Sequence, residues 1–118
     1  MYYNQDFANA LLENKNLINT ELHQTNLVLH TNYVFTDSNN MLTLYILQGK
    51  SGESYLCDIG SILDIADDLD LPAKVVKANA TKFGLKVEGV KIYCTADINQ
   101  INDQLQNFID FVKHLGLI

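Results

Sequence analysis

The sequence predicts a single α+β domain over residues 1–118, with one antiparallel sheet of about five strands and helices packed mainly on one of its faces. Segments in which apolar and polar residues alternate, as they do in strands, follow one another with only short polar turns between them. Elsewhere the apolar residues recur every three or four positions, which is typical of a helix with one buried side. A length of 118 residues suits one hydrophobic core. The expected element order is α-β-β-β-α-α-β-β-α.

The first half of the chain predicts one helix and then a meander of strands. The helix is expected over residues 4–14, where its apolar side is modest. Apolar and polar residues alternate over 27–35, and the polar run TDSNN then supplies turn residues. Segment 41–47 is apolar on both faces apart from Thr43, which indicates a central strand. A further strand is expected over 55–59, after the turn GKSGE.

The second half predicts short helices, a hairpin and a long final helix. Gly60 ends the preceding strand and Ser61 begins a helix, with Asp64 placed for a capping box. Pro72 suits the first turn of the next helix, where its missing N–H costs nothing. That helix is expected to end at Gly84. Strands over 85–87 and 90–94 then form a hairpin whose turn is Glu88 and Gly89. The last helix is expected to be capped by Asp97, with Gln100 as its reciprocal partner, and to stop at Gly116.

The final helix carries apolar residues on more than one side. A three-four repeat like that of a coiled-coil seam is widened by Ile109 and Phe111. Such a helix is either deeply buried in its own protein or shared with another chain. Packing on the protein's own sheet is the favoured interpretation, and a homodimer joined through this helix is the alternative. The repeat consists of Ile98, Ile101, Leu105, Phe108, Val112 and Leu115.

Composition narrows the classes of partner. The net charge is −6, and all eight cationic residues are lysines. An acidic chain without arginine is poorly suited to nucleic-acid backbones and anionic membranes, so we expect neither direct nucleic-acid binding nor membrane association. No apolar run approaches a membrane span, and the N-terminus does not resemble a signal peptide. The expected location is the cytoplasm, or the host cytoplasm if a phage encodes the protein.

Motifs for cofactors or nucleophilic catalysis are absent from the sequence. It contains no G-x-G-x-x-G, no P-loop and no G-x-S-x-G, so no cofactor and no catalytic residue is predicted. Cys57 and Cys94 lie in apolar segments predicted as strands. Buried thiols that act as small hydrophobic groups are the favoured interpretation, and a disulfide between them is the alternative.

The clearest chemical pattern is a segregation of charge. Residues 51–71 contain six acids and no base, and residues 74–91 contain five lysines and one acid. A rotation of 100° per residue places the aspartates of the helix at Ser61 opposite its apolar side. They form either an ordinary solvated surface, balanced by the lysines that follow, or a recognition surface for a basic partner. The predicted partner-binding residues are Asp58, Asp64, Asp67, Asp68 and Asp70.

A metal site is the third interpretation of these acids. Asp58 at a strand end and Asp64 on the next helix supply the oxygen ligands that Mg²⁺ or Mn²⁺ takes. Together with a lysine near the scissile phosphate, they would suit a metal-dependent phosphodiesterase or nuclease.

Two stretches, SYLCDIGSILDIADDL and KFGLKVEGVKIYCTAD, resemble an uncharacterised domain-of-unknown-function family that is frequent in bacterial and phage genomes. The likeness covers about residues 25–97 and departs from the family pattern at Cys57 and Ile59, which replace polar residues. It implies an association with phages or other mobile elements and brings no established activity. The matching turn, core and hairpin positions are Tyr55, Leu56, Asp58, Gly60, Phe83, Gly84 and Ile92.

Taken together, these patterns predict a small, non-enzymatic interaction or regulatory protein. Its expected partner is a basic protein, for example a host-defence nuclease such as a CRISPR effector, whose positive channel the aspartates would block. The alternatives are the metal-dependent phosphodiesterase and a homodimeric regulatory module.

Overall fold

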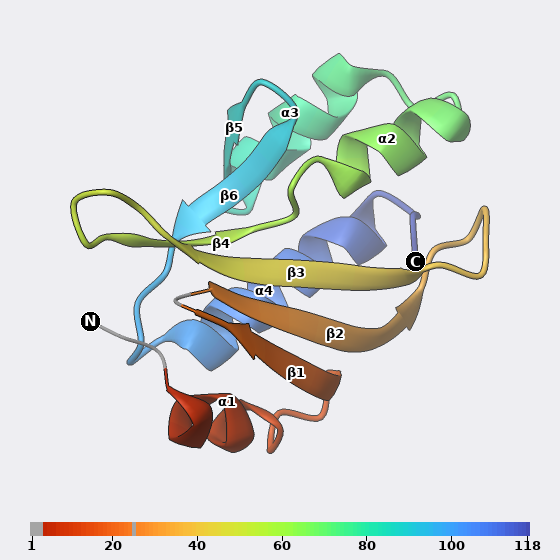
Figure 1. The fold of residues 1–118 in the computed structure, drawn as a ribbon. Helices are drawn as coiled ribbons and strands as arrows, with labels where there is room; N and C mark the ends of the chain where they lie inside the picture. The colour runs from red at the N-terminus through yellow and green to blue at the C-terminus, as the bar shows by residue number, and fades with distance from the viewer. Residues whose placement is uncertain (1–3, 25) are drawn as a thin grey trace.

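The computed structural model describes residues 4–24 and 26–118, and this part of the chain has a six-stranded antiparallel sheet and four helices (Figure 1). The α+β class and the single sheet are as predicted. The elements are α1 (Gln5–Leu11), β1 (Leu17–His23), β2 (Asn26–Val34), β3 (Met41–Gln48), β4 (Ser54–Cys57), α2 (Ser61–Asp68), α3 (Ala73–Lys82), β5 (Lys86–Glu88), β6 (Lys91–Thr95) and α4 (Ile101–His114).

Strand β1 was missing from the predicted order, so the expectation of about five strands is corrected to six. The strand lies at one edge of the sheet and pairs only with β2. Its register shifts between Leu17 and Asn19, so the two-residue alternation is interrupted near its start. Leu17 is buried while Ile18 is 55% exposed. A half-covered edge strand with a bulge has little apolar alternation for a sequence pattern to detect.

The strand order is β1-β2-β3-β4-β6-β5, and every neighbouring pair is antiparallel. The first four strands follow one another as a meander. The chain then leaves the sheet through α2 and α3 and returns as the β5–β6 hairpin, whose second strand lies beside β4 (Figure 1). The short segments on either side of α2 are thereby brought next to residues far along the chain.

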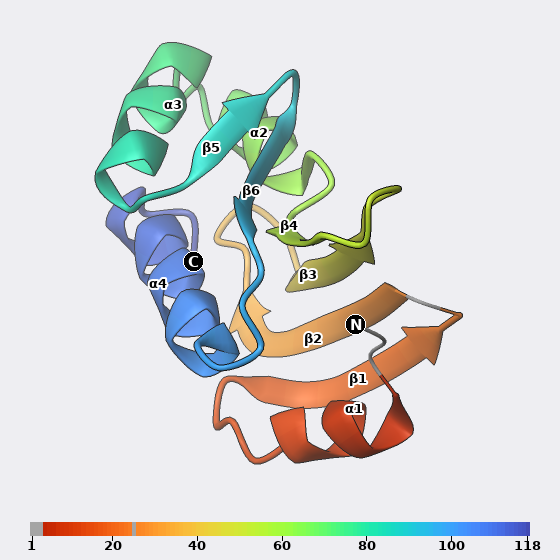
Figure 2. The same ribbon diagram turned by 90° about the vertical axis from the view of Figure 1, so that its left-hand side faces the viewer.

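Helix α4 covers one face of the sheet, and Figure 2 shows it lying along that face below α3. The strands present leucine and isoleucine to it, and full burial of one such side chain stabilises the fold by about 1.5–3 kcal/mol. The opposite face of the sheet carries the alternate residues of each strand, which are mostly half-buried. The fully buried apolar residues of the strands are Leu27, Leu29, Leu42, Leu44, Ile46, Leu56 and Ile92.

The additional apolar residues of α4 are buried within the chain itself. Ile109 and Phe111 are both 0% exposed. The ring of Phe111 lies 5.7 Å from that of Phe83, which follows α3, so α4 is enclosed by the sheet and by the α3 region. This confirms that the helix packs on its own protein. The exposed side chains of α4 are all polar, so the apolar surface that suggested a homodimer is accounted for.

The bounds of two helices differ from the prediction. Helix α1 ends at Leu11, earlier than expected. Helix α4 begins at Ile101, because Asp97 bonds the Asn99 N–H in a turn before the helix. Gln104 of α4 bonds back to the backbone at Asp97 and Thr95 and holds this turn in place. None of the helices in the described ranges is long and apolar enough to cross a membrane.

Candidate functional site

Asp58, at the end of β4, is the buried side chain on which the turn into α2 is built. Its Oδ1 accepts the N–H groups of Gly60 and Ile92, each at 2.9 Å, and its Oδ2 accepts that of Ile62 at 3.0 Å. Ile62 lies in the first turn of α2 and Ile92 in β6. One carboxylate therefore joins β4, α2 and β6, and it is only 1% exposed.

The predicted capping box between Ser61 and Asp64 is wrong. The N-cap of α2 is Gly60, and no side chain of the cap itself bonds the helix. Asp58 accepts the N–H of Ile62 instead, while the Ser61 hydroxyl donates to the Asp58 carbonyl at 3.1 Å. The capping group thus comes from the preceding strand end, a placement that the capping-box spacing does not reveal.

Asp58 has no cation within ion-pair distance among the described residues. In the described part of the chain, ion-pair distances are reached only between Glu21 and the histidines His23 and His30. Burial raises the pKa of Asp58, and the backbone N–H groups act in the opposite direction. The sequence placed Asp58 in the partner-binding set, but its side chain is too buried to belong to an exposed interaction surface.

The turn after Asp58 has unusual backbone angles. Ile59 has φ 57° and Gly60 has φ 92°. A β-branched residue in the left-handed region is a true outlier and carries strain of about 1–2 kcal/mol. A Cβ added at Gly60 would lie 3.1 Å from Cγ2 of Val90, so glycine also allows the β5–β6 hairpin to approach. Three hydrogen bonds to Asp58 hold this turn in place.

The other four predicted residues are exposed and lie on or just after α2. We call Asp64, Asp67, Asp68 and Asp70 the acidic surface. The lysines that follow along the chain do not neutralise it, since none of the described lysines comes within ion-pair distance of these aspartates. The interpretation in which the lysines balance the acids is therefore not supported by direct pairing.

Three members of the acidic surface occupy unfavourable positions. Asp67 and Asp68 lie in the last turn of α2, where the helix dipole favours a cation and no base is present. Asp70 has φ 57° and occupies the position after the helix that glycine usually takes. The N–H groups of Asp70 and Leu71 bond back to Asp67 and Ala66 at 3.1 and 2.8 Å, as in a Schellman motif. These acids do not stabilise the helix that carries them.

A groove of about 420 Å³ lies between the start of α2 and strand β3. We call it the acidic groove. Its β3 wall is formed by Met41, Thr43 and Tyr45, which alternate with core residues and so belong to the sheet face opposite α4. Among the described residues that line it, the charged ones are Asp58 and Asp64, and none is a base. These lining residues are Phe35, Asn40, Met41, Thr43, Tyr45, Asp58, Ser61, Asp64 and Ile65.

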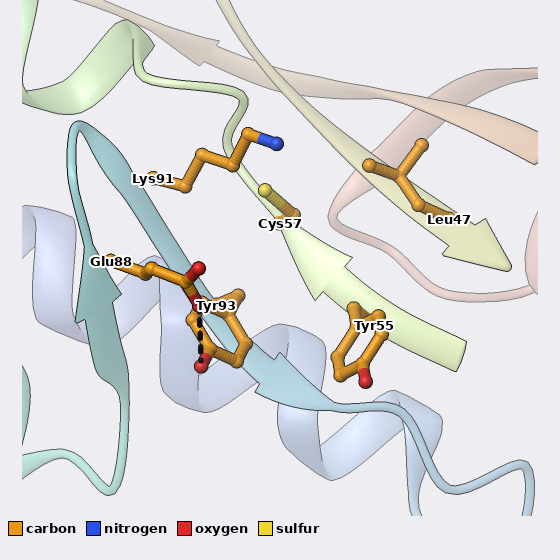
Figure 3. Close-up of a pocket in the computed structure, with 6 residues that line it drawn as sticks. All are labelled: Leu47, Tyr55, Cys57, Glu88, Lys91 and Tyr93. Atoms are coloured by element: carbon orange, nitrogen blue, oxygen red, sulfur yellow. Dashed lines mark hydrogen bonds between the residues drawn. The ribbon is translucent and has the colours of Figure 1, made fainter. Parts of the chain in front are cut away.

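A second hollow, of about 240 Å³, lies on the same face across β4 and β6. We call it the tyrosine pocket, and Figure 3 shows its side chains. The rings of Tyr55 and Tyr93 meet edge to face at 5.6 Å, and the Tyr93 hydroxyl donates to Glu88 at 3.5 Å. Lys91 extends toward Cys57 (Figure 3). The full lining is Leu47, Tyr55, Cys57, Glu88, Lys91 and Tyr93.

The two cysteines are both free thiols. Cys57 pairs with Tyr93 and lines the tyrosine pocket, whereas Cys94 pairs with Leu56 of the core face. Since neighbouring residues point to opposite faces of a sheet, the two sulfurs lie on different sides and the alternative of a disulfide is excluded. Burial raises the pKa of both thiols, that of Cys94 to about 11, so neither is an activated nucleophile.

The metal interpretation finds no ligand set. Among residues 4–24 and 26–118, no three His, Cys, Asp or Glu side chains are grouped so as to hold a metal ion. Asp58 and Asp64 do line one groove, but no third such ligand joins them. The oxygens of Asp58 are also engaged by backbone N–H groups.

Neither the groove nor the contact between Tyr55 and Tyr93 could be predicted from the sequence. Tyr45, Tyr55 and Tyr93 occupy the strand positions between core residues, so the same alternation that revealed the strands also marks them. No family model, curated protein or solved structure matches the chain. The likeness of residues 25–97 to a domain-of-unknown-function family therefore stays a prediction.

Proposed function

We propose that this protein binds a basic protein partner through the acidic surface of α2 and acts by occupying the partner, without catalysing a reaction. The observation that carries the proposal is the placement of four exposed aspartates that no described lysine pairs with. Asp67, Asp68 and Asp70 are also at positions where acids reduce helix stability. A loss of folding stability that no other contact compensates is expected where a surface serves to recognise a partner.

Electrostatic binding of this kind has a characteristic behaviour. Opposite charges steer the two proteins together, and salt weakens the attraction because the Debye length falls to about 8 Å at physiological ionic strength. The net charge of −6 adds to the attraction for any basic partner.

The partner class that we propose is proteins that bind nucleic acid, including host-defence nucleases. Their positive channels are built to meet a line of phosphate charges, and the acidic surface presents several carboxylates within one short helix and its end. Binding there would exclude the nucleic acid. A panel of such nucleases tests this class: the protein is expected to slow cleavage, and added nucleic acid substrate is expected to compete with it.

A defined basic probe tests the surface itself. We would measure binding of an arginine- and lysine-rich peptide by fluorescence anisotropy. Neutralising the acidic surface with Asp64→Asn/Asp67→Asn/Asp68→Asn/Asp70→Asn is expected to weaken binding about tenfold or more. The matched control is Glu13→Gln/Asp37→Asn/Asp103→Asn/Asp110→Asn, which removes four exposed acids elsewhere and gives the same net charge.

The control variant shows whether binding depends on the acidic surface or only on the net charge of the protein. A loss below about threefold in the control, with the large loss in the first variant, supports the proposal. Equal losses in both variants would show that only net charge matters, and the acidic surface would then be ordinary solvated helix.

A further inference from the structure

We infer that the acidic groove between α2 and β3 receives an arginine side chain of the partner. This rests on the proposed function, because Asp64 belongs both to the acidic surface and to the groove lining. The groove would supply a fixed anchoring point within a surface that otherwise attracts basic proteins without a defined geometry.

The size and lining of the groove fit an extended cationic side chain. Its volume of about 420 Å³ falls within the range of small-ligand sites. Phe35, Met41 and Ile65 provide apolar walls for a carbon stem, as arginine needs when it buries its chain and keeps its charged end in contact with acids. Tyr45 contributes an aromatic ring, and aromatic faces attract cations by about 0.5–2 kcal/mol.

The charge of the groove is one-sided. Both of its charged residues, Asp58 and Asp64, are acids, and no base lines it. Asp58 is 1% exposed and has no cation within ion-pair distance in the described residues. The N–H groups of Gly60, Ile62 and Ile92 already engage the carboxylate of Asp58, so a cation entering the groove would pair with the exposed carboxylate of Asp64.

Arginine suits these surroundings better than lysine. Its planar guanidinium can stack on an aromatic ring while its N–H groups reach a carboxylate, whereas the lysine ammonium is a compact and strongly hydrated charge. The chain itself contains no arginine, since all eight of its cationic residues are lysines. A second copy of this chain therefore cannot supply the guanidinium, and we place its source outside the chain.

A titration followed by NMR tests the groove with small probes. Nα-acetyl-arginine methylamide is expected to shift the resonances of Thr43, Tyr45 and Asp64. The lysine analogue is expected to bind about threefold or more weakly, and the uncharged citrulline analogue to leave these resonances unchanged. Resonances of the tyrosine pocket are expected to stay in place with all three probes.

Single substitutions of equal charge then separate the groove from the rest of the surface. Asp64→Asn is expected to weaken binding of the arginine probe about fivefold, because it removes the exposed carboxylate of the groove. Asp67→Asn removes the same charge from α2 outside the groove lining and is expected to change affinity by less than about twofold. Tyr45→Leu keeps the charge and is expected to reduce the preference for arginine over lysine.

The outcomes distinguish this inference from the function on which it rests. Equal effects of Asp64→Asn and Asp67→Asn, or equal binding of the arginine and citrulline probes, overturn the groove as an arginine site. If the basic peptide still depends on the acidic surface in that case, the proposed function stands without the groove. Arginine binding that is lost in Asp64→Asn and kept in Asp67→Asn supports the inference.

Discussion

The acidic groove and the tyrosine pocket lie on the same face of the sheet but differ in charge. They adjoin where Tyr45 of the groove pairs with Cys57 of the pocket. The groove has two acids and no base, whereas the pocket contains Glu88 and Lys91, which have opposite signs and occupy paired positions on β5 and β6.

The origin of this difference lies in which elements border each hollow. The pocket is formed by strands alone, and Glu88 occupies the position paired with Lys91, although the two side chains are not within ion-pair distance. The groove is bordered by α2, whose aspartates have no cationic neighbour within ion-pair distance among the described residues. Both hollows contain tyrosine, so the difference between them is one of charge: the acidic groove suits a cation, whereas the tyrosine pocket is nearly neutral.

The largest effect on stability is expected from Asp58→Asn, which tests whether this residue of the groove wall holds the fold together. An amide can still accept two N–H groups but turns a donor toward the third, so one buried N–H is left unsatisfied. We expect a loss of about 2–3 kcal/mol in the free energy of unfolding, measured by urea denaturation.

Asp64→Asn serves as the control for Asp58→Asn, because Asp64 is exposed and makes no hydrogen bond to a buried group. It is expected to change stability by less than about 0.5 kcal/mol. Similar stabilities for the two variants would contradict the structural role of Asp58.

The second effect is a loss of stability at high pH, caused by Cys57 of the pocket and Cys94 of the core face. Burial raises the pKa of Cys57 and Cys94 above their ordinary value of 9.0, so the folded state holds these protons more firmly than the unfolded state. Stability from these thiols is therefore present below pH 9 and is lost as pH rises toward about 11, the pKa of Cys94.

Urea denaturation between pH 8 and 11 measures this loss, which for Cys94 amounts to about 2 kcal/mol at most. The variant Cys57→Ala/Cys94→Ala is expected to show a shallower decline over that range. An unchanged decline would assign the alkaline sensitivity to lysine and tyrosine instead.

A third prediction tests whether charge balance alone separates the two hollows. Lys91→Met removes the base from the tyrosine pocket and leaves Glu88 beside Tyr93. The arginine probe is then expected to shift the Tyr55 and Tyr93 resonances, which it leaves in place in the unmodified protein. Lys86→Met, on the neighbouring strand but outside the pocket lining, is the control. No binding in Lys91→Met would show that the shape of the groove matters as much as its charge.

The smallest effect is expected from Asp70→Gly at the end of α2. Glycine adopts the left-handed conformation of this position without strain, and the change also removes an acid from the negative end of the helix dipole. We expect stabilisation of about 0.5–1 kcal/mol by thermal unfolding. Asp70→Ala removes the same charge but keeps a Cβ, so a gain confined to the glycine variant isolates the backbone contribution. Weaker binding of the basic peptide to both variants would link the lost stability to function.

Much of the fold could be predicted from local patterns. The period of two over β2, the apolar run of β3 and the period of three to four in α2, α3 and α4 involve residues close together in the chain, so they are visible in the sequence itself. The exposure of Asp64, Asp67 and Asp68 follows from the same helical geometry. Strand β1 escaped detection because a bulged edge strand is only partly covered.

The sequence by itself determined the α+β class, most of the elements and the acidic character of α2, because each depends on residues only a few positions apart. Only the tertiary structure decided the role of Asp58, which binds the backbone of Ile92, 34 residues away, and which sequence spacing had placed in the partner-binding set. It also separated Cys57 from Cys94 by strand pairing and brought α2 beside β3 to form the acidic groove. Such contacts depend on which strands become neighbours, and that choice is made by the packing of the whole core.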